Sequence, residues 1–288
     1  MKKSKLAKVL TVSLAALMVF GLASCGGGSG KVSDKDITVI SREEGSGTRD
    51  AFTELTGVLQ DDVDKTVDTA EISNSTSVVT QSVAGNDAAI GYISLGSLDD
   101  TVKAVKVDGV EATVDNIKSG DYKIQRPFNI VTKGEVKELP ADFIKFIMSK
   151  DGQKIIEDEG YISVNENAEA YKASGLKGSI TLAGSTSVSP VMEVLADKYK
   201  ELNNGVTIEI QQTGSGAGIQ STTEGVCDIG MASRELKDEE TSQGLKSEEI
   251  ALDGIAVIVN KDNGVEDLSM DQIMKIFTGE ITNWADVK

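Results

Sequence analysis

Short apolar runs rich in β-branched residues alternate with segments of helical spacing along most of this chain, and this alternation restricts its fold more than any other feature. The runs predict strands at 37–41, 88–95, 128–133, 180–183, 206–212, 228–233 and 255–260. The helical spacing predicts helices at 47–56, 76–85, 140–149, 151–159, 188–203 and 269–277. Strands that alternate with helices indicate an α/β fold with mixed, largely parallel sheets.

The N-terminus has the pattern of a secretion signal. Four lysines lie within residues 1–8, residues 9–20 are almost wholly apolar, and Leu22-Ala23-Ser24-Cys25 follows. A basic start, a short apolar run and small residues predict a signal peptide over 1–24. The segment before Cys25 resembles the lipobox of bacterial lipoproteins, which implies a lipid on Cys25 and anchorage on the outer face of the cytoplasmic membrane. Residues 25–36 would then be a glycine-rich flexible tether. The alternative is a secreted protein with an incidental cysteine.

The charge of the chain excludes some partners. Without the four signal-peptide lysines, 25 basic residues stand against 46 acidic ones, a net charge near −21. A chain this acidic is a poor partner for nucleic acid or for an anionic membrane surface. An anionic ligand would have to be held by local dipoles and a few cations.

The sequence contains no histidine. This excludes Ser-His-Asp and Cys-His catalysis, histidine-ligated zinc and the commonest general base. The P-loop signature of nucleotide-binding proteins, paired Cys-x-x-Cys motifs and loops of EF-hand spacing are also absent from the sequence. We expect no catalytic residues, no cofactor and no metal, although an enzyme that uses Asp, Glu or Lys is not excluded.

Three segments each combine a strand, a turn of small residues and a helix start: Ser41–Arg49, Gly184–Pro190 and Thr213–Ile219. Glycines let the backbone approach a ligand closely, and a helix start presents unpaired N–H groups and the positive end of the helix dipole. Together they predict a site for a tetrahedral oxyanion, which Arg42 could grip with two hydrogen bonds. Taken singly, each segment could be an ordinary capped turn, and Arg42 could be a surface residue paired with Glu43 or Glu44.

Several segments together resemble hallmarks of the phosphate-binding proteins of phosphate ABC importers, and they cover nearly all of residues 37–288. They are 39–52 (VISREEGSGTRDAF), 88–95 (AAIGYISL), 143–161 (FIKFIMSKDGQKIIEDEGY), 180–190 (ITLAGSTSVSP), 213–219 (TGSGAGI), 228–235 (DIGMASRE) and 271–284 (DQIMKIFTGEITNW). The resemblance implies a monomeric, two-lobed clamp of the class II periplasmic-binding-protein type. It would hold inorganic phosphate in its cleft, deliver it to permease subunits and make no covalent change.

The resemblance also implies which residues bind phosphate. They are Arg42, Ser46, Gly47, Thr48, Thr186, Ser187, Ser215 and Gly216. Glu44 matches an acid that orients the arginine in relatives.

One position departs from the family. Well-known members carry an aspartate where this chain has Arg234, and that aspartate accepts a hydrogen bond from the proton that phosphate carries and sulfate lacks. Glu44 or Glu235 could replace this acceptor. Arg234 could add a second cation to the site, or lie at its rim paired with Glu235 or Asp238.

The order of the segments is also unusual, because in the family the part like 180–284 precedes the part like 37–161. The chain resembles a circular permutant with one lobe at 127–261 and the other at 37–126 plus 262–288, joined by a hinge near 126–130 and 258–262. The Arg42 site would lie in the discontinuous lobe, and the sites at Thr186 and Ser215 in the continuous one. A truncated tandem is the alternative.

Two other functions remain open at this point. One is a receptor of the same fold for sulfate or molybdate. The other is a phosphatase-like hydrolase with Ser187 or Ser46 as its nucleophile.

Overall fold

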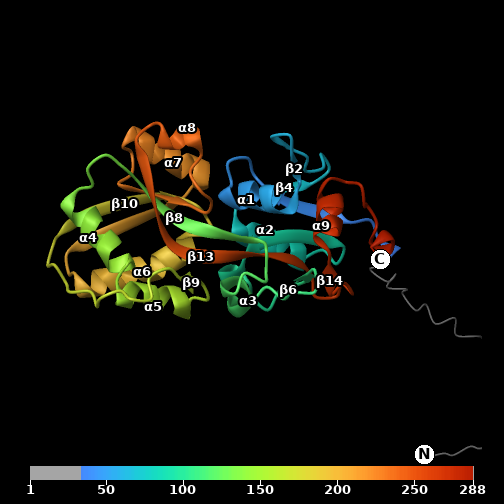
Figure 1. Cartoon of the computed structure of the whole chain (residues 1–288), viewed down its shortest axis with the longest axis horizontal. Helices are drawn as coiled ribbons and strands as arrows, with labels where there is room; N and C mark the ends of the chain where they lie inside the picture. The colour runs from blue at the N-terminus through green and yellow to red at the C-terminus, as the bar shows by residue number, and fades with distance from the viewer. Residues whose placement is uncertain (1–33, 288) are drawn as a thin grey trace, which may run out of the picture. The chain divides into compact units, whose positions relative to one another are not determined.

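The computed structural model describes residues 34–287 (Figure 1). The signal peptide predicted at 1–24, Cys25 and most of the tether lie outside the described residues. Across residues 34–287, no helix is both long enough and apolar enough to cross a membrane.

In this part of the chain, ten strands form one curled mixed sheet with a central path β11-β10-β12-β8-β13-β5-β1-β4, and β6 and β9 also pair with β13. These strands are β1 (Thr38–Arg42), β4 (Glu71–Ser73), β5 (Ala89–Ser94), β6 (Val102–Ala104), β8 (Gln125–Lys133), β9 (Ile162–Ser163), β10 (Gly178–Gly184), β11 (Val206–Gln212), β12 (Ile229–Ala232) and β13 (Leu245–Asn260). Two short pairs lie apart from it: β2 (Leu59–Gln60) with β3 (Val63–Asp64), and β7 (Lys106–Val107) with β14 (Asp267–Leu268).

The sheet is parallel at its two ends and antiparallel in the middle. Strand β10 runs parallel to β11 and β12, and β1 runs parallel to β4 and β5. The central strands β8 and β13 are antiparallel to each other and to their outer neighbours. The mixed α/β fold predicted from the sequence is confirmed, with the parallel pairing restricted to the outer strands.

Helices pack around the sheet in two groups. The first group is α1 (Gly47–Thr56), α2 (Thr76–Ala84), α3 (Val114–Lys118) and α9 (Met270–Phe277). The second is α4 (Glu138–Ile147), α5 (Lys150–Asp158), α6 (Ser189–Leu202), α7 (Ser215–Glu224) and α8 (Asp238–Thr241). Short 3₁₀ turns occur at Leu95–Ser97 and Trp284–Asp286.

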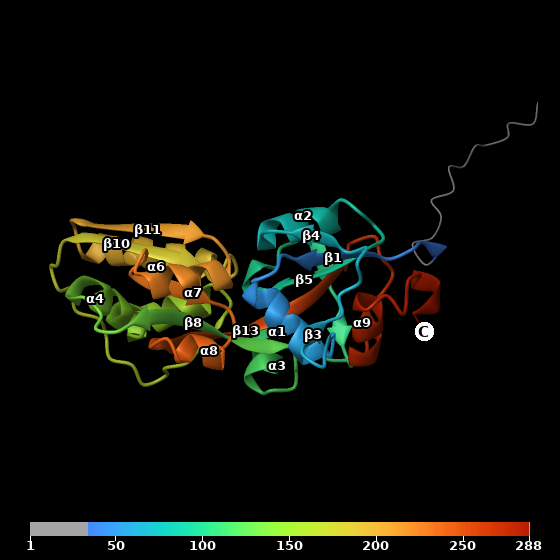
Figure 2. The same ribbon diagram turned by 90° about the horizontal axis from the view of Figure 1, so that it is seen from above.

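The chain forms two lobes (Figure 2). Each lobe has its own hydrophobic core. In the first lobe, Phe52 stacks on Tyr92 with ring centroids 3.9 Å apart, and Phe277 packs edge-on against Phe52. In the second lobe, Phe143 and Tyr199 pack with their ring centroids 5.0 Å apart. Strands β8 and β13 run from one lobe into the other, as both views show.

Strand β13 changes the expected position of one crossing. It is a single strand of 16 residues. Ala251 packs in the second core, whereas Ile255 packs in the first and pairs with Ser94 of β5. The chain therefore returns to the first lobe between these two residues, earlier than the crossing expected at 258–262. The sequence predicts the run at 255–260 as a separate strand of the second lobe, but it is the end of a strand that spans both lobes.

Candidate anion-binding site

The three segments singled out in the sequence meet at the edge between the lobes. The Thr48 and Ser187 hydroxyls lie 2.9 Å apart, which joins the first segment to the second. The Gly216 amide donates to the Gly45 carbonyl at 2.9 Å, which joins the third segment to the first. Helices α1, α2, α6 and α7 all begin here, so the positive ends of their dipoles lie around one place.

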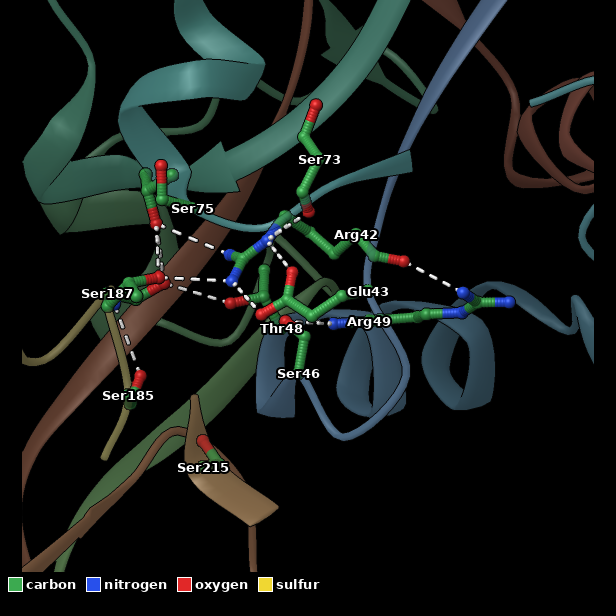
Figure 3. A network of polar contacts seen from close by, with 12 residues as sticks. Arg42, Glu43, Ser46, Thr48, Arg49, Ser73, Ser75, Ser185, Ser187 and Ser215 are labelled. Carbon is green, nitrogen blue, oxygen red and sulfur yellow. Dashed lines mark hydrogen bonds and ion pairs between the residues drawn. The ribbon is translucent and has the colours of Figure 1, made fainter. Parts of the chain in front are cut away.

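Arg42, the last residue of β1, is the buried cation of this site (Figure 3). Its side chain is 2% exposed. Its Nε and Nη2 atoms donate to the two carboxylate oxygens of Glu43, each at 2.8 Å. Its other edge faces hydroxyls, with Nη2 3.1 Å from Thr186 Oγ1 and Nη1 3.5 Å from Thr76 Oγ1. One edge of the guanidinium is thus neutralised, and the other can grip an oxyanion.

The acid that contacts Arg42 is Glu43, whereas the family resemblance predicts Glu44 in this role. The Ser46 amide donates to the Glu43 carbonyl at 3.2 Å, and Gly45 has a φ of 80°. These features define a tight turn that requires glycine at its third position and leaves Glu44 exposed at its corner. Turn geometry therefore selects Glu43 as the partner of Arg42.

Hydroxyl groups fill the space beside the arginine. Thr76 Oγ1 lies 3.3 Å from Thr186 Oγ1 and 3.2 Å from Ser187 Oγ. Each of these side chains is at most 5% exposed, as is Thr48. Hydroxyls both donate and accept, so they can turn from one another to a bound anion. Thr76 and Thr186 also line a cleft of about 870 Å³ between the lobes, which gives solvent access.

Thr76 belongs to this cluster but is not among the site residues predicted from the sequence. It is the first residue of α2, after the N-cap Ser75. The hydroxyl-rich run Asn74-Ser75-Thr76-Ser77 before the helix predicted at 76–85 was a usable signal. The run lacks glycine, and so it did not match the pattern of the other three segments.

The starts of α1 and α7 form one side of the site, with residues Ser46, Gly47, Ser215 and Gly216. Ser46 is the N-cap of α1 and accepts from the Arg49 amide at 3.4 Å. A side chain at Gly47 would place its Cβ 2.5 Å from Ser215 Oγ, so only glycine fits. The Ser215 hydroxyl in turn accepts from the Ser233 amide at 3.2 Å.

A buried tyrosine supports the end of β1. The Tyr92 hydroxyl lies 2.9 Å from Ser41 Oγ and accepts from the Arg42 amide at 3.2 Å. Burial raises the pKa of Tyr92 to about 12, so the hydroxyl stays protonated at neutral pH. Tyr92 therefore fixes the backbone from which Arg42 projects.

Arg234 and Glu235 occupy different positions from those expected at the site. Arg234 is buried, and its Nε donates to Asp50 at 2.9 Å. Its Nη1 and Nη2 atoms donate to the two carboxylate oxygens of Glu240, each at 2.8 Å. The carboxylates of Asp50 and Glu240 thus neutralise its charge, in place of the expected Glu235 or Asp238. Glu235 is exposed.

Among residues 34–287, no cluster of Cys, Asp or Glu side chains is placed to hold a metal ion. Chemically, the arrangement supplies hydrogen-bond donors, helix dipoles and one buried guanidinium.

Comparisons with known proteins agree with this fold. Residues 28–151 and 169–288 match a family model described as a PBP superfamily domain, the class of periplasmic binding proteins. The chain is 52% identical to phosphate-binding protein PstS 2 of Streptococcus agalactiae serotype V over 294 residues, which covers 100% of this chain and 99% of that protein. It is 38% identical to the PstS protein of Bacillus subtilis over 128 residues, but this match covers only 43% of either chain.

A solved structure is similar over most of the chain. It is a phosphate-binding protein of a phosphate ABC transporter from Streptococcus pneumoniae TIGR4, with 49% identity and a TM-score of 0.72. The match covers 88% of this chain and 100% of the other. Within the PBP superfamily, this chain belongs to the PstS family of phosphate-binding proteins. The family resemblance found in the sequence is confirmed.

Proposed function

We propose that this chain captures inorganic phosphate between its lobes and delivers it to the permease of an ABC importer, outside the cytoplasm. The observation that carries the proposal is the buried Arg42 guanidinium, whose Nη1 and Nη2 atoms face hydroxyls at a point where helices begin. The names of the similar proteins from Streptococcus support the choice of phosphate. The residues supply hydrogen bonds and charge only, so the ligand leaves unchanged and the chain acts as a receptor.

The ligand residues of the proposal are those expected from the sequence, with one addition. Arg42, Thr186 and Ser187 would donate to phosphate, together with Thr76. On binding, these side chains would exchange their hydrogen bonds with one another for hydrogen bonds to the phosphate oxygens. Ser46, Gly47, Thr48, Ser215 and Gly216 would complete the shell through hydroxyls and helix-start amides.

Selectivity for phosphate needs a group that accepts a hydrogen bond from the protonated ligand. We assign this role to Glu43, because its carboxylate contacts Arg42, the residue that would grip the anion. Glu44 and Glu235, the acceptors considered from the sequence, are both exposed. A carboxylate that faces fully ionised sulfate would be repelled and left without a hydrogen bond.

Sulfate competition tests this selectivity. We expect sulfate to bind at least about tenfold more weakly than phosphate at neutral pH, because the loss of a hydrogen bond to the charged Glu43 carboxylate costs about 1.5–3 kcal/mol and repulsion adds to it. In Glu43→Gln, the amide can donate to sulfate, so the ratio should fall towards one. Isothermal titration calorimetry measures both affinities.

Glu44→Gln is the matched control, since it makes the same change one residue away, at the exposed corner of the turn. Its ratio of phosphate to sulfate affinity should equal that of the unmodified protein. Equal affinities in the unmodified protein would favour the receptor for another oxyanion. An unchanged ratio in Glu43→Gln would remove Glu43 from the selectivity mechanism.

The proposal includes anchorage through a lipid on Cys25, which rests on the sequence pattern at 22–25. The first described residues belong to the lobe that carries Arg42, so the tether would attach there. The mass of the N-terminal peptide of the mature protein, with or without a diacylglyceryl group, decides this part.

The proposal also includes the permuted order of the segments. Asp36 and Asn283 form an antiparallel bridge, and the Ile37 amide donates to the Thr282 carbonyl at 2.8 Å. The first and last described elements are therefore adjacent, as the permuted order requires. A different segment order in the Bacillus subtilis protein would also explain why its match covers only 43% of either chain. An alignment that keeps the order of the sequence can include only one of two exchanged halves.

A chain restored to the other order should fold and bind phosphate. Its N-terminus would be Ala173 and its C-terminus Lys172, both exposed, with Val287 joined to Asp36 by a short Gly/Ser linker. We expect its phosphate affinity to stay within about threefold, because the cut falls in an exposed loop and the join links adjacent ends. Calorimetry and circular dichroism measure binding and folding. The same joined chain opened between Asp253 and Gly254 should not fold, and loss of folding in both would argue against the permuted order.

A further inference from the structure

One ion pair joins the two lobes beside the site. Asp50 lies in the first turn of α1 in the first lobe, and Arg234 follows β12 in the second. Arg234 Nε donates to Asp50 Oδ2 at 2.9 Å. The residue before Arg234 is Ser233, whose amide bonds Ser215 of the proposed site. The ion pair is therefore one residue away from the anion shell without belonging to it.

Arg234 is held in place from its own lobe. Glu240, on α8, binds its two terminal nitrogens at 2.8 Å, and the Glu235 carbonyl accepts from Nη1 at 2.8 Å. The arginine is thus ordered and charge-paired whether or not Asp50 is near. Closure of the lobes would add the Asp50 contact at little cost in side-chain entropy, which is the usual weakness of ion pairs near a surface.

The pair also affects the charge that the ligand meets. Asp50 is an acid near the N-terminus of α1, where its negative charge competes with an anion for the helix dipole. When the lobes are closed, Arg234 partly neutralises this charge. The contact consequently favours the closed lobes and the bound anion together.

We propose that the Asp50–Arg234 ion pair holds the lobes closed over the bound anion, so that it governs how slowly the anion leaves without contacting it. The inference rests on the proposed function for its ligand. It gives Arg234 a role between the lobes, at a position where well-known relatives carry an aspartate.

The test separates association from dissociation. The full-length protein is loaded with radiolabelled inorganic phosphate, and release is followed after a chase of unlabelled phosphate. In Asp50→Asn we expect release about tenfold faster, with an association rate within about twofold, because the contact forms only as the lobes close. An unchanged release rate, or a loss of affinity through slower association, would overturn the proposal.

Asp64→Asn is the matched control. Asp64 pairs with Arg49 of the same helix α1 at 2.6 Å, and both residues belong to the first lobe. The control removes the same charge from the same lobe but leaves the contact between the lobes, so its release rate should stay within about twofold. Similar acceleration in both variants would assign the effect to charge alone.

Two further measurements cover other outcomes. If Asp50→Asn fails to fold, Arg234→Lys serves instead. It keeps the charge but lacks the planar fork that reaches Asp50 and Glu240 together, so it should release phosphate faster than the unmodified protein. Small-angle scattering of the ligand-free protein needs no phosphate. Because the ion pair stabilises the closed form whenever the lobes meet, its loss in Asp50→Asn should shift the ligand-free protein towards open lobes and a larger radius of gyration, and an equal radius would contradict the proposal. If the unmodified protein bound no phosphate, the proposed function would be wrong. The scattering comparison would still test whether the Asp50–Arg234 ion pair holds the lobes closed.

Discussion

Replacing Arg42 with methionine is expected to weaken phosphate binding about a thousandfold while the protein stays folded. The Arg42 guanidinium is buried and directs its Nη1 and Nη2 atoms at the Thr76 and Thr186 hydroxyls, where the anion would lie. A hydrogen bond to a charged group contributes about 1.5–3 kcal/mol, so the loss of two corresponds to about 4 kcal/mol in binding free energy. Glu43 loses its partner in this variant, but its side chain is 26% exposed, so water can solvate the carboxylate. Isothermal titration calorimetry measures the affinity.

Two other variants calibrate this result. Arg42→Lys keeps the charge but cannot form the planar two-bond grip, so its affinity should fall between those of the unmodified protein and Arg42→Met. Thr48→Ala removes one neutral hydroxyl and should cost about tenfold at most. Thermal unfolding of each variant shows whether the fold is retained. Small and equal losses for Arg42→Met and Thr48→Ala would be incompatible with the site described above.

Replacing Asp253 with asparagine is expected to lower the free energy of unfolding by about 3–5 kcal/mol, because it leaves a buried guanidinium without a counter-ion. Asp253 and Arg126 are opposite each other on β13 and β8, where the chain passes between the lobes. Arg126 Nε and Nη2 donate to Asp253 Oδ2 at 3.1 and 3.0 Å, and both side chains are at most 1% exposed. Urea denaturation followed by circular dichroism measures the change.

The double variant Arg126→Met/Asp253→Leu should be more stable than Asp253→Asn alone. Burial raises the pKa of Asp253 to about 6 even though Arg126 opposes the shift, so removing the carboxylate from water outweighs its attraction to the arginine. Replacing both charges with apolar side chains removes that cost, whereas replacing one leaves the other unpaired. The exposed pair of Lys154 and Asp158 provides a control, and Asp158→Asn should not change the denaturation midpoint measurably. If Asp253→Asn left the free energy of unfolding unchanged, water or other polar groups would have to solvate Arg126.

Local patterns were sufficient to predict much of the fold. Helix α1 begins and ends where the sequence predicted, because Ser46 caps its start and Gly57, with a φ of 77°, ends it in a conformation that favours glycine. Strands β1, β5, β10, β11 and β12 were recognisable as short β-branched runs for the same local reason, whereas the three-residue edge strand β4 was not predicted. The strand-turn-helix segments that carry Arg42, Thr48, Thr186 and Ser187 were also recognisable from local patterns, although their meeting depends on long-range contacts.

Other features depend on contacts between residues far apart in the sequence. Strand β13 was read as a short run because its first half is exposed at several positions and lacks a continuous apolar pattern. Glu43 and Glu44 are chemically equivalent in the sequence, and only the turn at Gly45 directs one of them to Arg42. The partners of Arg234 lie on α1 and α8, and neither was among the acids considered from the sequence.

By itself, the sequence determined the class of fold, the glycine- and hydroxyl-rich helix starts and the arginine beside them, because periodicity, capping and glycine turns act over a few residues. The tertiary structure alone decided which acid neutralises Arg42, that Thr76 joins the hydroxyl cluster, and that Arg234 connects the lobes through Asp50. It also placed the Arg126–Asp253 pair across the two strands that join the lobes. These contacts depend on how β8 and β13 carry the chain between two cores, and no short stretch of sequence contains that information.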